Sequence, residues 1–162
     1  LMLEAERFHD TQILAYSAKY ASSFYGPFRE ALYSDVALGK ADKKTYQLNY
    51  ANSQEAVAEV EMDINEGADM IMVKPGLPYL DIIKSLKDRF NLPILAYQVS
   101  GEYTMLKLAA ANGIINETDA FLEVMLGFKR AGCNAILTYA ALEIAAFLQK
   151  CENLNLKELG YG

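Results

Sequence analysis

Two lysines are the residues of this 162-residue sequence best suited to covalent chemistry. Lys74 follows four apolar residues, 70–73, and precedes Pro75, while Lys19 ends the stretch "ILAYSAK". A lysine attacks a ketone or aldehyde to form an imine only when it is neutral, and an ordinary pKa of about 10.4 leaves almost none neutral at pH 7. Burial and a second nearby ammonium group both lower that pKa. Two lysines at neighbouring strand ends would supply both effects, and Lys74 is the better candidate nucleophile.

The elements that must position these lysines are short and apolar. The sequence predicts strands at 13–17, 70–73, 94–99 and 135–139, each followed by a stretch with helical periodicity. Repeated strand–helix units, with strands apolar enough to be buried on both faces, indicate an α/β fold with a parallel sheet.

The strand segments also resemble one another. "ILAYSAK" aligns with "ILAYQVS", and "GADMIMVK" aligns with "GCNAILTY", so that Lys19 corresponds to Ser100 and Lys74 to Tyr139. All four strands are therefore predicted to end in polar side chains. In (βα) barrels the active-site residues lie at the C-terminal ends of the strands, and four βα units make half of an eight-unit barrel.

Helix signals lie between the strands. Asn52-Ser53-Gln54-Glu55 resembles a capping box, and Gly67 suits the end of the helix that it would begin. Pro78 suits the first turn of a second helix. Further helices are predicted over 101–112, 118–131 and 141–151, the first two with inward-facing Met, Leu and Phe side chains. We interpret 1–162 as one barrel segment in which the long crossover at about 20–53 forms a lid over the strand ends.

Composition excludes several function classes. The net charge of −6 argues against general nucleic-acid binding. No apolar stretch approaches the roughly 20 residues of a membrane span, and we expect no signal peptide. Cys133 and Cys151 form no recognisable motif, so we interpret them as reduced thiols of a cytoplasmic protein.

Four long stretches are similar to one known family. "YSAKYASSFYGPFRE", "MVKPGLPYLDII", "YQVSGEY" and "KRAGCNAILTYAA" resemble porphobilinogen synthase, also called 5-aminolevulinate dehydratase, and the resemblance runs from about His9 to Leu148. It implies a (βα)8 TIM barrel, usually assembled into homo-octamers. It also implies a lyase of tetrapyrrole (heme) biosynthesis, which condenses two 5-aminolevulinate molecules into porphobilinogen with loss of two waters.

The resemblance implies a role for each strand-end residue. Lys74 matches the lysine that forms a Schiff base with one substrate, and Lys19 matches the second active-site lysine. Ser100 and Tyr139 match the pair whose hydroxyls bind a substrate carboxylate. A solvated lysine, a helix-capping Ser100 and a core tyrosine at 139 are the alternatives to these roles.

The resemblance also implies roles within and beside the lid. Arg29 matches an arginine that binds the other carboxylate, with Gln47 assisting. Lys43 stands where the family usually has a second lid arginine, so it keeps the charge but loses the bidentate fork, and Lys40 or Lys44 could serve instead. Glu59 matches the carboxylate that binds an allosteric magnesium in some members, although a carboxylate on an acidic helix is usually only solvated.

The resemblance covers only the C-terminal half of the family's length. The N-terminal half would supply four more strands, an assembly arm and the acidic or cysteine cluster that binds a catalytic zinc or magnesium in many members. Because a half barrel exposes two sheet edges, we expect these 162 residues alone to be poorly folded or inactive. Two other functions stay open: a class I aldolase-like enzyme that uses a lysine imine, and an inactive half barrel that serves as an assembly module.

Overall fold

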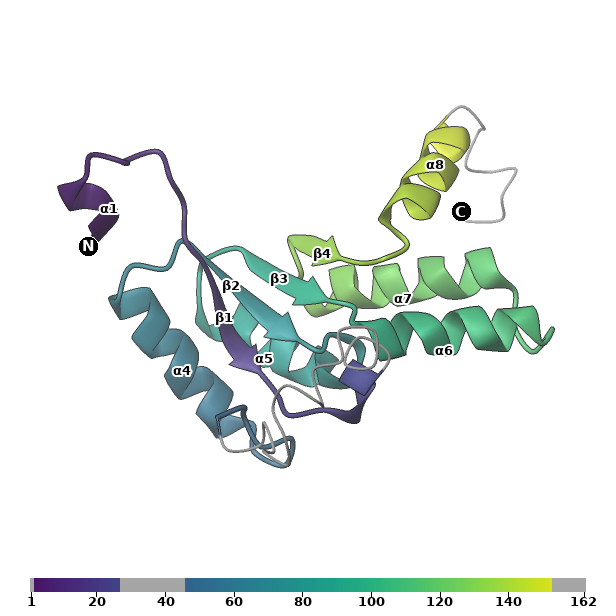
Figure 1. The fold of residues 1–162 in the computed structure, drawn as a ribbon, viewed down its shortest axis with the longest axis horizontal. Helices are drawn as coiled ribbons and strands as arrows, with labels where there is room; N and C mark the ends of the chain where they lie inside the picture. The colour runs from purple at the N-terminus through teal and green to yellow at the C-terminus, as the bar shows by residue number, and fades with distance from the viewer. Residues whose placement is uncertain (1, 27–45, 153–162) are drawn as a thin grey trace.

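The computed structural model describes residues 2–26 and 46–152, which form strand–helix units in succession (Figure 1). The strands alternate with helices as the sequence predicts. In chain order the elements are α1 (Met2–Ala5), β1 (Leu14–Lys19), the 3-10 helix η1 (Ser23–Tyr25), α4 (Gln54–Asn65), β2 (Met70–Lys74), the 3-10 helix η3 (Leu77–Tyr79), α5 (Leu80–Arg89), β3 (Ile94–Tyr97), α6 (Ser100–Ala111), α7 (Glu117–Ala131), β4 (Ala135–Leu137) and α8 (Ala141–Glu152).

The four strands form one parallel sheet in the order β1-β2-β3-β4, which confirms the predicted architecture. Lys19 and Lys74 are register partners on β1 and β2, despite an irregularity earlier in β1 between Ala15 and Ala18. Because neighbouring parallel strands run about 4.8 Å apart, this register brings the two lysines to the same end of the sheet.

All four strands end one or two residues from the predicted position, and β2 ends at Lys74 rather than at 73. β1 continues to Lys19 because its pairing with β2 extends that far. β3 ends at Tyr97 and β4 at Leu137, so Tyr139 lies beyond its strand. After β3 the Gln98 N–H still donates to the Leu137 carbonyl of β4. The Val99 N–H instead donates to the Glu102 side chain of α6, so the ladder of sheet hydrogen bonds stops there.

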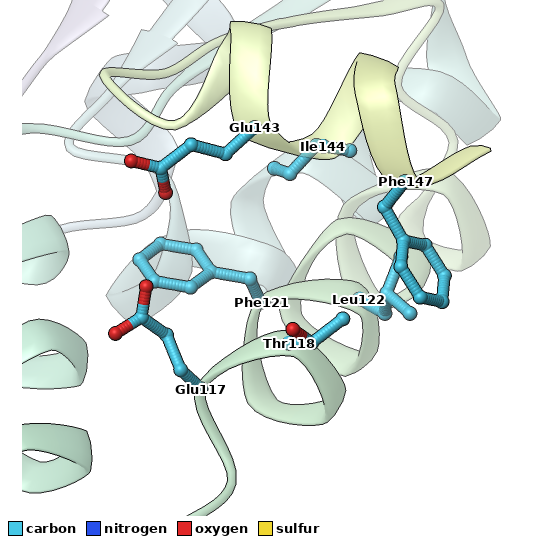
Figure 2. Close-up of a pocket in the computed structure, with 7 residues that line it drawn as sticks. All are labelled: Glu117, Thr118, Phe121, Leu122, Glu143, Ile144 and Phe147. Carbon is cyan, nitrogen blue, oxygen red and sulfur yellow. The ribbon is translucent and has the colours of Figure 1, made fainter. Parts of the chain in front are cut away.

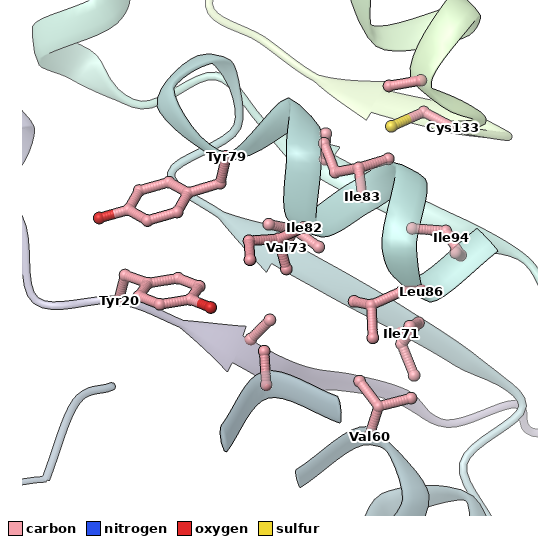
Figure 3. Close-up of a cluster of buried hydrophobic side chains, with 14 of the residues drawn as sticks. Tyr20, Val60, Ile71, Val73, Tyr79, Ile82, Ile83, Leu86, Ile94 and Cys133 are labelled. Atoms are coloured by element: carbon pink, nitrogen blue, oxygen red, sulfur yellow. The ribbon is translucent and has the colours of Figure 1, made fainter. Parts of the chain in front are cut away.

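The hydrophobic core lies between one face of the sheet and helices α4, α5 and α7 (Figure 3). Ile71 and Val73 of β2 point into this core, so the strand alternation directs Met72 and Lys74 to the opposite face. The two faces of the sheet thus differ: helices pack against one, and Lys74 lies on the other. Tyr20 and Tyr79 close the end of the core near Lys74, with stacked rings whose centroids are 4.1 Å apart.

Local signals at the helix ends act as predicted. Asn52 caps α4, since its Oδ1 accepts hydrogen bonds from the backbone N–H groups of Gln54 and Glu55. Gly67 follows α4 with φ 99°, a conformation that favours glycine. The described residues include no helix long and apolar enough to cross a membrane.

The prediction that the apolar side chains of α6 and α7 all face inward is wrong in part. Phe121 and Phe128 are buried, but Met105, Leu108 and Leu126 are 48%, 58% and 56% exposed. α6 packs mainly on η1 and α7 rather than on the sheet, and Met105 and Leu108 lie on a side of α6 that is about half exposed.

Candidate active site at the strand ends

The Lys74 ammonium group lies among three tyrosine rings at the C-terminal end of β2. Its Nζ is 3.9 Å from the ring centroid of Tyr97, 5.4 Å from that of Tyr16 and 5.9 Å from that of Tyr25. Tyr16 comes from β1, Tyr97 from the last position of β3, and Tyr25 from η1. Three separate elements therefore form the surroundings of this one amine.

These surroundings lower the pKa of Lys74. Burial is the larger cause, because it removes water from the ammonium form, and the positive charge of Lys19 is the second. The ring faces act in the opposite direction, since they attract a cation. The pKa nevertheless falls below its ordinary value, which is the condition that imine chemistry requires.

The backbone at Lys74 is fixed by hydrogen bonds from the segment after β1. The Lys74 carbonyl accepts from the Tyr20 N–H at 2.9 Å and from the Tyr25 hydroxyl at 3.1 Å. The peptide bond that follows, between Lys74 and Pro75, is cis. The backbone that bears the candidate nucleophile is thus tied directly to the end of β1.

Tyr139 and Ser100 lie on the β3 and β4 side of the sheet. The rings of Tyr139 and Tyr97 are 6.5 Å apart, and burial, followed by a hydrogen bond with Tyr139, raises the pKa of Tyr97. Tyr139 is 48% exposed, so it is not a core tyrosine. Ser100 is the first residue of α6, and the N-cap position belongs to Val99, so Ser100 does not act as the N-cap.

Lys19 lines a cavity of about 460 Å³ at the β1 side of the sheet. Gln47 and Glu59, two other residues predicted from the sequence, line the same cavity. The Oε1 atom of Gln47 is buried without a hydrogen-bond partner among the described residues, so it is available as an acceptor. Arg29 and Lys43, like the central part of the predicted lid, lie outside the described residues.

Glu59, the carboxylate predicted to bind magnesium, lies on α4 and lines this cavity together with Glu55. Within 2–26 and 46–152, no three His, Cys, Asp or Glu side chains lie close enough to hold a metal ion. Glu55, one turn away on α4, lines the same cavity, but so does the cationic Lys19. Magnesium can be held by one or two carboxylates and several waters, yet a neighbouring ammonium group opposes a second cation.

Cys133 is buried and free, and burial raises the pKa of its thiol to about 11. A thiol with so high a pKa is a poor nucleophile and a poor metal ligand near neutral pH.

The sequence analysis missed four residues at this site: Tyr16, Tyr25, Tyr97 and the carboxyl group of Glu102, which accepts a hydrogen bond from the Leu77 N–H. Tyr97 could have been found, because the alternation that places Ile94 and Ala96 in the core places Tyr97 on the face of Lys74. Glu102 carried a weaker signal, three residues after a helix-start position. Tyr25 carried none, since its contact with Lys74 joins residues 49 positions apart.

A second cavity, of about 190 Å³, lies between α7 and α8, away from both lysines (Figure 2). Figure 2 shows Ile144 and Phe147 of α8 facing the side chains of α7. Lys107 of α6 forms ion pairs with Glu117 and Glu143 at its rim. No residue singled out from the sequence lines this cavity.

Comparison with known proteins identifies the relatives of this chain. The family model described as delta-aminolevulinic acid dehydratase matches residues 1–147. The chain belongs to the delta-aminolevulinic acid dehydratase family. The dehydratase of Rhodobacter capsulatus is 58% identical over 139 residues, which are 86% of this chain and 42% of that protein. The dehydratase of Archaeoglobus fulgidus is 52% identical over 147 residues, which are 91% of this chain and 45% of that protein.

The structural comparison agrees. The crystal structure of delta-aminolevulinic acid dehydratase (porphobilinogen synthase) from Toxoplasma gondii, in complex with the reaction product porphobilinogen, superimposes with a TM-score of 0.86 at 57% identity. The match covers 90% of this chain and 41% of the Toxoplasma chain. The four βα units therefore belong to the TIM-barrel fold of the dehydratase family, as predicted, and the chain spans less than half the length of these relatives.

Proposed function

We propose that this chain supplies the two imine-forming lysines of a porphobilinogen synthase, a hydro-lyase that condenses two molecules of 5-aminolevulinate. The observation that carries the proposal is the register of Lys19 with Lys74 on adjacent parallel strands, with the pKa of Lys74 lowered by burial and by the Lys19 charge. Family membership supports the choice of substrate over that of an aldolase.

The first chemical step uses the neutral form of the Lys74 amine. Its neutral Nζ attacks the ketone carbon of one 5-aminolevulinate, a C–N bond forms, and the ketone oxygen leaves as water. Lys19 activates the second substrate. Condensation of the two bound molecules then yields porphobilinogen, with a total loss of two waters. The ring faces of Tyr16, Tyr25 and Tyr97 hold the amine in place for the attack.

The remaining predicted residues bind the substrate carboxylates. The hydroxyls of Ser100 and Tyr139 hold one carboxylate on the β3 and β4 side, where Tyr139 lies close to Tyr97. Gln47 assists at the other carboxylate with Arg29 and Lys43.

A complete enzyme of this kind would also need the other half of the barrel. The lysine-bearing face of the sheet needs the other barrel strands to enclose the substrates, so we propose that activity requires them. Homo-oligomers, octamers in the family, and a cytoplasmic location are part of this proposal, as is a catalytic zinc or magnesium held outside this chain. Magnesium at Glu59 would need further ligands from outside the described residues.

Sodium borohydride trapping tests the proposal, because it reduces an imine to a stable amine. We would use a chimera in which this chain replaces the aligned segment of the Rhodobacter capsulatus relative, and compare it with the 162-residue chain alone. With 5-aminolevulinate present, peptide mass spectrometry should find the adduct on Lys74 of the chimera. Lys74→Met should abolish it, and Lys129→Met, which removes an exposed lysine of α7, should not.

The same chimera tests the role of Lys19. Lys19→Met should still give an adduct at Lys74 but little porphobilinogen, measured by its colour reaction with an aromatic aldehyde. An adduct on a lysine other than Lys74 or Lys19, or porphobilinogen formation that survives Lys74→Met, would refute the proposed function.

A further inference from the structure

Glu102 is a fully buried carboxyl group in the first turn of α6. Ser17 and Gln98 are the only other polar residues that are buried in the described part of the chain. Burial of a charged group is costly unless hydrogen bonds compensate for the lost water, so a buried carboxylate at Glu102 requires hydrogen-bond donors around it.

Three backbone N–H groups donate to this carboxylate. Oε1 accepts from Leu77 at 2.6 Å, and Oε2 accepts from Val99 at 2.6 Å and from Gly76 at 3.4 Å. Burial raises the pKa of Glu102 above its ordinary value, and these three hydrogen bonds offset only part of that rise. Because all three partners are donors, the ionised form, which only accepts, is the form that the site accommodates.

The three partners belong to two different strand ends. Gly76 and Leu77 follow Lys74 where β2 leads into η3, whereas Val99 follows β3 and immediately precedes Ser100. A helix cap would need only the Val99 contact. The contacts to Gly76 and Leu77 cross 25 or more positions of sequence and connect the loop of Lys74 to the start of α6.

Lys74 is thereby fixed on both sides. Its own carbonyl is held by Tyr20 and Tyr25, and the amides two and three positions later are held by Glu102. The backbone at Gly76 also packs closely against Phe128, since a Cβ atom there would lie 2.5 Å from the Phe128 ring. One carboxylate therefore sets the spacing between the Lys74 loop and the segment that bears Ser100.

We infer that Glu102 is a positioning residue for imine formation, which holds the Lys74 amine at the correct distance from a substrate bound beside Ser100. This inference rests on the proposed function. Glu102 itself touches no reacting atom. Misplacement of a reacting group by about 1 Å can cost about 100-fold in rate, so a loosened loop should slow the attack without removing the amine.

The test uses the chimera with Glu102→Gln, which is nearly isosteric but replaces one acceptor oxygen with an NH₂ group that faces N–H donors. Glu123→Gln, an exposed carboxyl of α7, is the matched control. Three quantities are measured: the rate of borohydride-trapped adduct formation over a series of 5-aminolevulinate concentrations up to saturation, the final adduct per chain, and amide hydrogen exchange. Glu102→Gln should lower the rate about 10- to 100-fold with KM changed less than about threefold.

The final adduct per chain separates positioning from simple stabilisation. A positioning role predicts the parental stoichiometry reached slowly, with faster exchange at Gly76, Leu77 and Val99. A destabilised protein would instead show fewer reactive chains, each reacting at the parental rate, and that result would overturn the inference. A parental rate in Glu102→Gln would overturn it as well.

Two further outcomes keep the two proposals distinct. If the parent chimera gives no adduct at Lys74, both the proposed function and the role of Glu102 fall. If the parent reacts and Glu102→Gln does not fold, Glu102→Asp, which keeps the charge but is one methylene shorter, is tested in its place. Failure of both variants to fold would make Glu102 a structural residue only.

Discussion

The substitution of glycine by alanine should have opposite effects at two positions beside Phe128. At Gly76 an added Cβ would lie 2.5 and 2.8 Å from two atoms of the Phe128 ring and 3.2 Å from the Tyr97 carbonyl oxygen. At Gly127, inside α7, it would meet only Leu80 and Arg130 side-chain atoms at 3.8 and 3.9 Å, which are ordinary van der Waals contacts. The chemical change is the same at both positions, so the surroundings alone decide whether the free energy of unfolding rises or falls.

The magnitudes follow from these distances. Phe128 is fully buried and cannot move aside without disturbing the core, so overpacking at Gly76 should cost about 1–3 kcal/mol. The reduced entropy of the unfolded chain returns about 0.4–1 kcal/mol. Gly76→Ala should therefore lower the free energy of unfolding by up to about 2.6 kcal/mol, whereas Gly127→Ala should raise it by about 0.5–1 kcal/mol because alanine is the better helix former.

The assay is thermal unfolding of both chimera variants at one fixed protein concentration, with the borohydride trapping rate measured in parallel. The shift should be smaller than the roughly 2–4 °C per kcal/mol of a 150–250-residue domain, because the chimera has the full length of the relative. Gly76→Ala should also slow adduct formation, since the clash lies two residues after Lys74, and Gly127→Ala should not. The reasoning fails if Gly76→Ala raises the unfolding temperature as Gly127→Ala does, or if it leaves the trapping rate at the parental value.

Three other predictions concern the environment of Lys74 and the core. Lys19→Met removes a charge that lowers the pKa of Lys74, so that pKa should rise. The pH at which borohydride trapping is half-maximal should then move upward. An unchanged pH profile would contradict this coupling. Tyr25→Phe removes the hydroxyl that donates to the carbonyls of Tyr20 and Lys74, so it should cost about 0.5–1.5 kcal/mol in unfolding free energy and slow trapping. Tyr50→Phe, at an exposed ring that does not line the Lys19 cavity, should change neither. Leu86→Ala should leave a cavity in the core and cost about 2–5 kcal/mol, measured by urea unfolding, while Leu142→Ala on the exposed side of α8 should change stability by less than about 0.5 kcal/mol.

The sequence by itself determined the succession of strands and helices, because these elements depend on local patterns. The apolar run 70–73 is buried or half-buried in a strand, Asn52 caps α4, and Gly67 ends it in a left-handed conformation, all as neighbouring residues dictate. The internal similarity of the strand segments also placed Lys19 and Lys74 at strand ends, and their pairing follows from a parallel sheet.

Only the tertiary structure decided what surrounds the lysines. Tyr16, Tyr25 and Tyr97 meet at Lys74 from three elements, and Glu102 joins loops that no local pattern connects. The exposure of Met105 and Leu108 was equally out of reach, since helical periodicity says which residues share a face but not whether another element covers it. Local patterns are set by backbone geometry over a few residues, whereas these contacts arise when the sheet and its helices pack, and so they depend on the whole described chain.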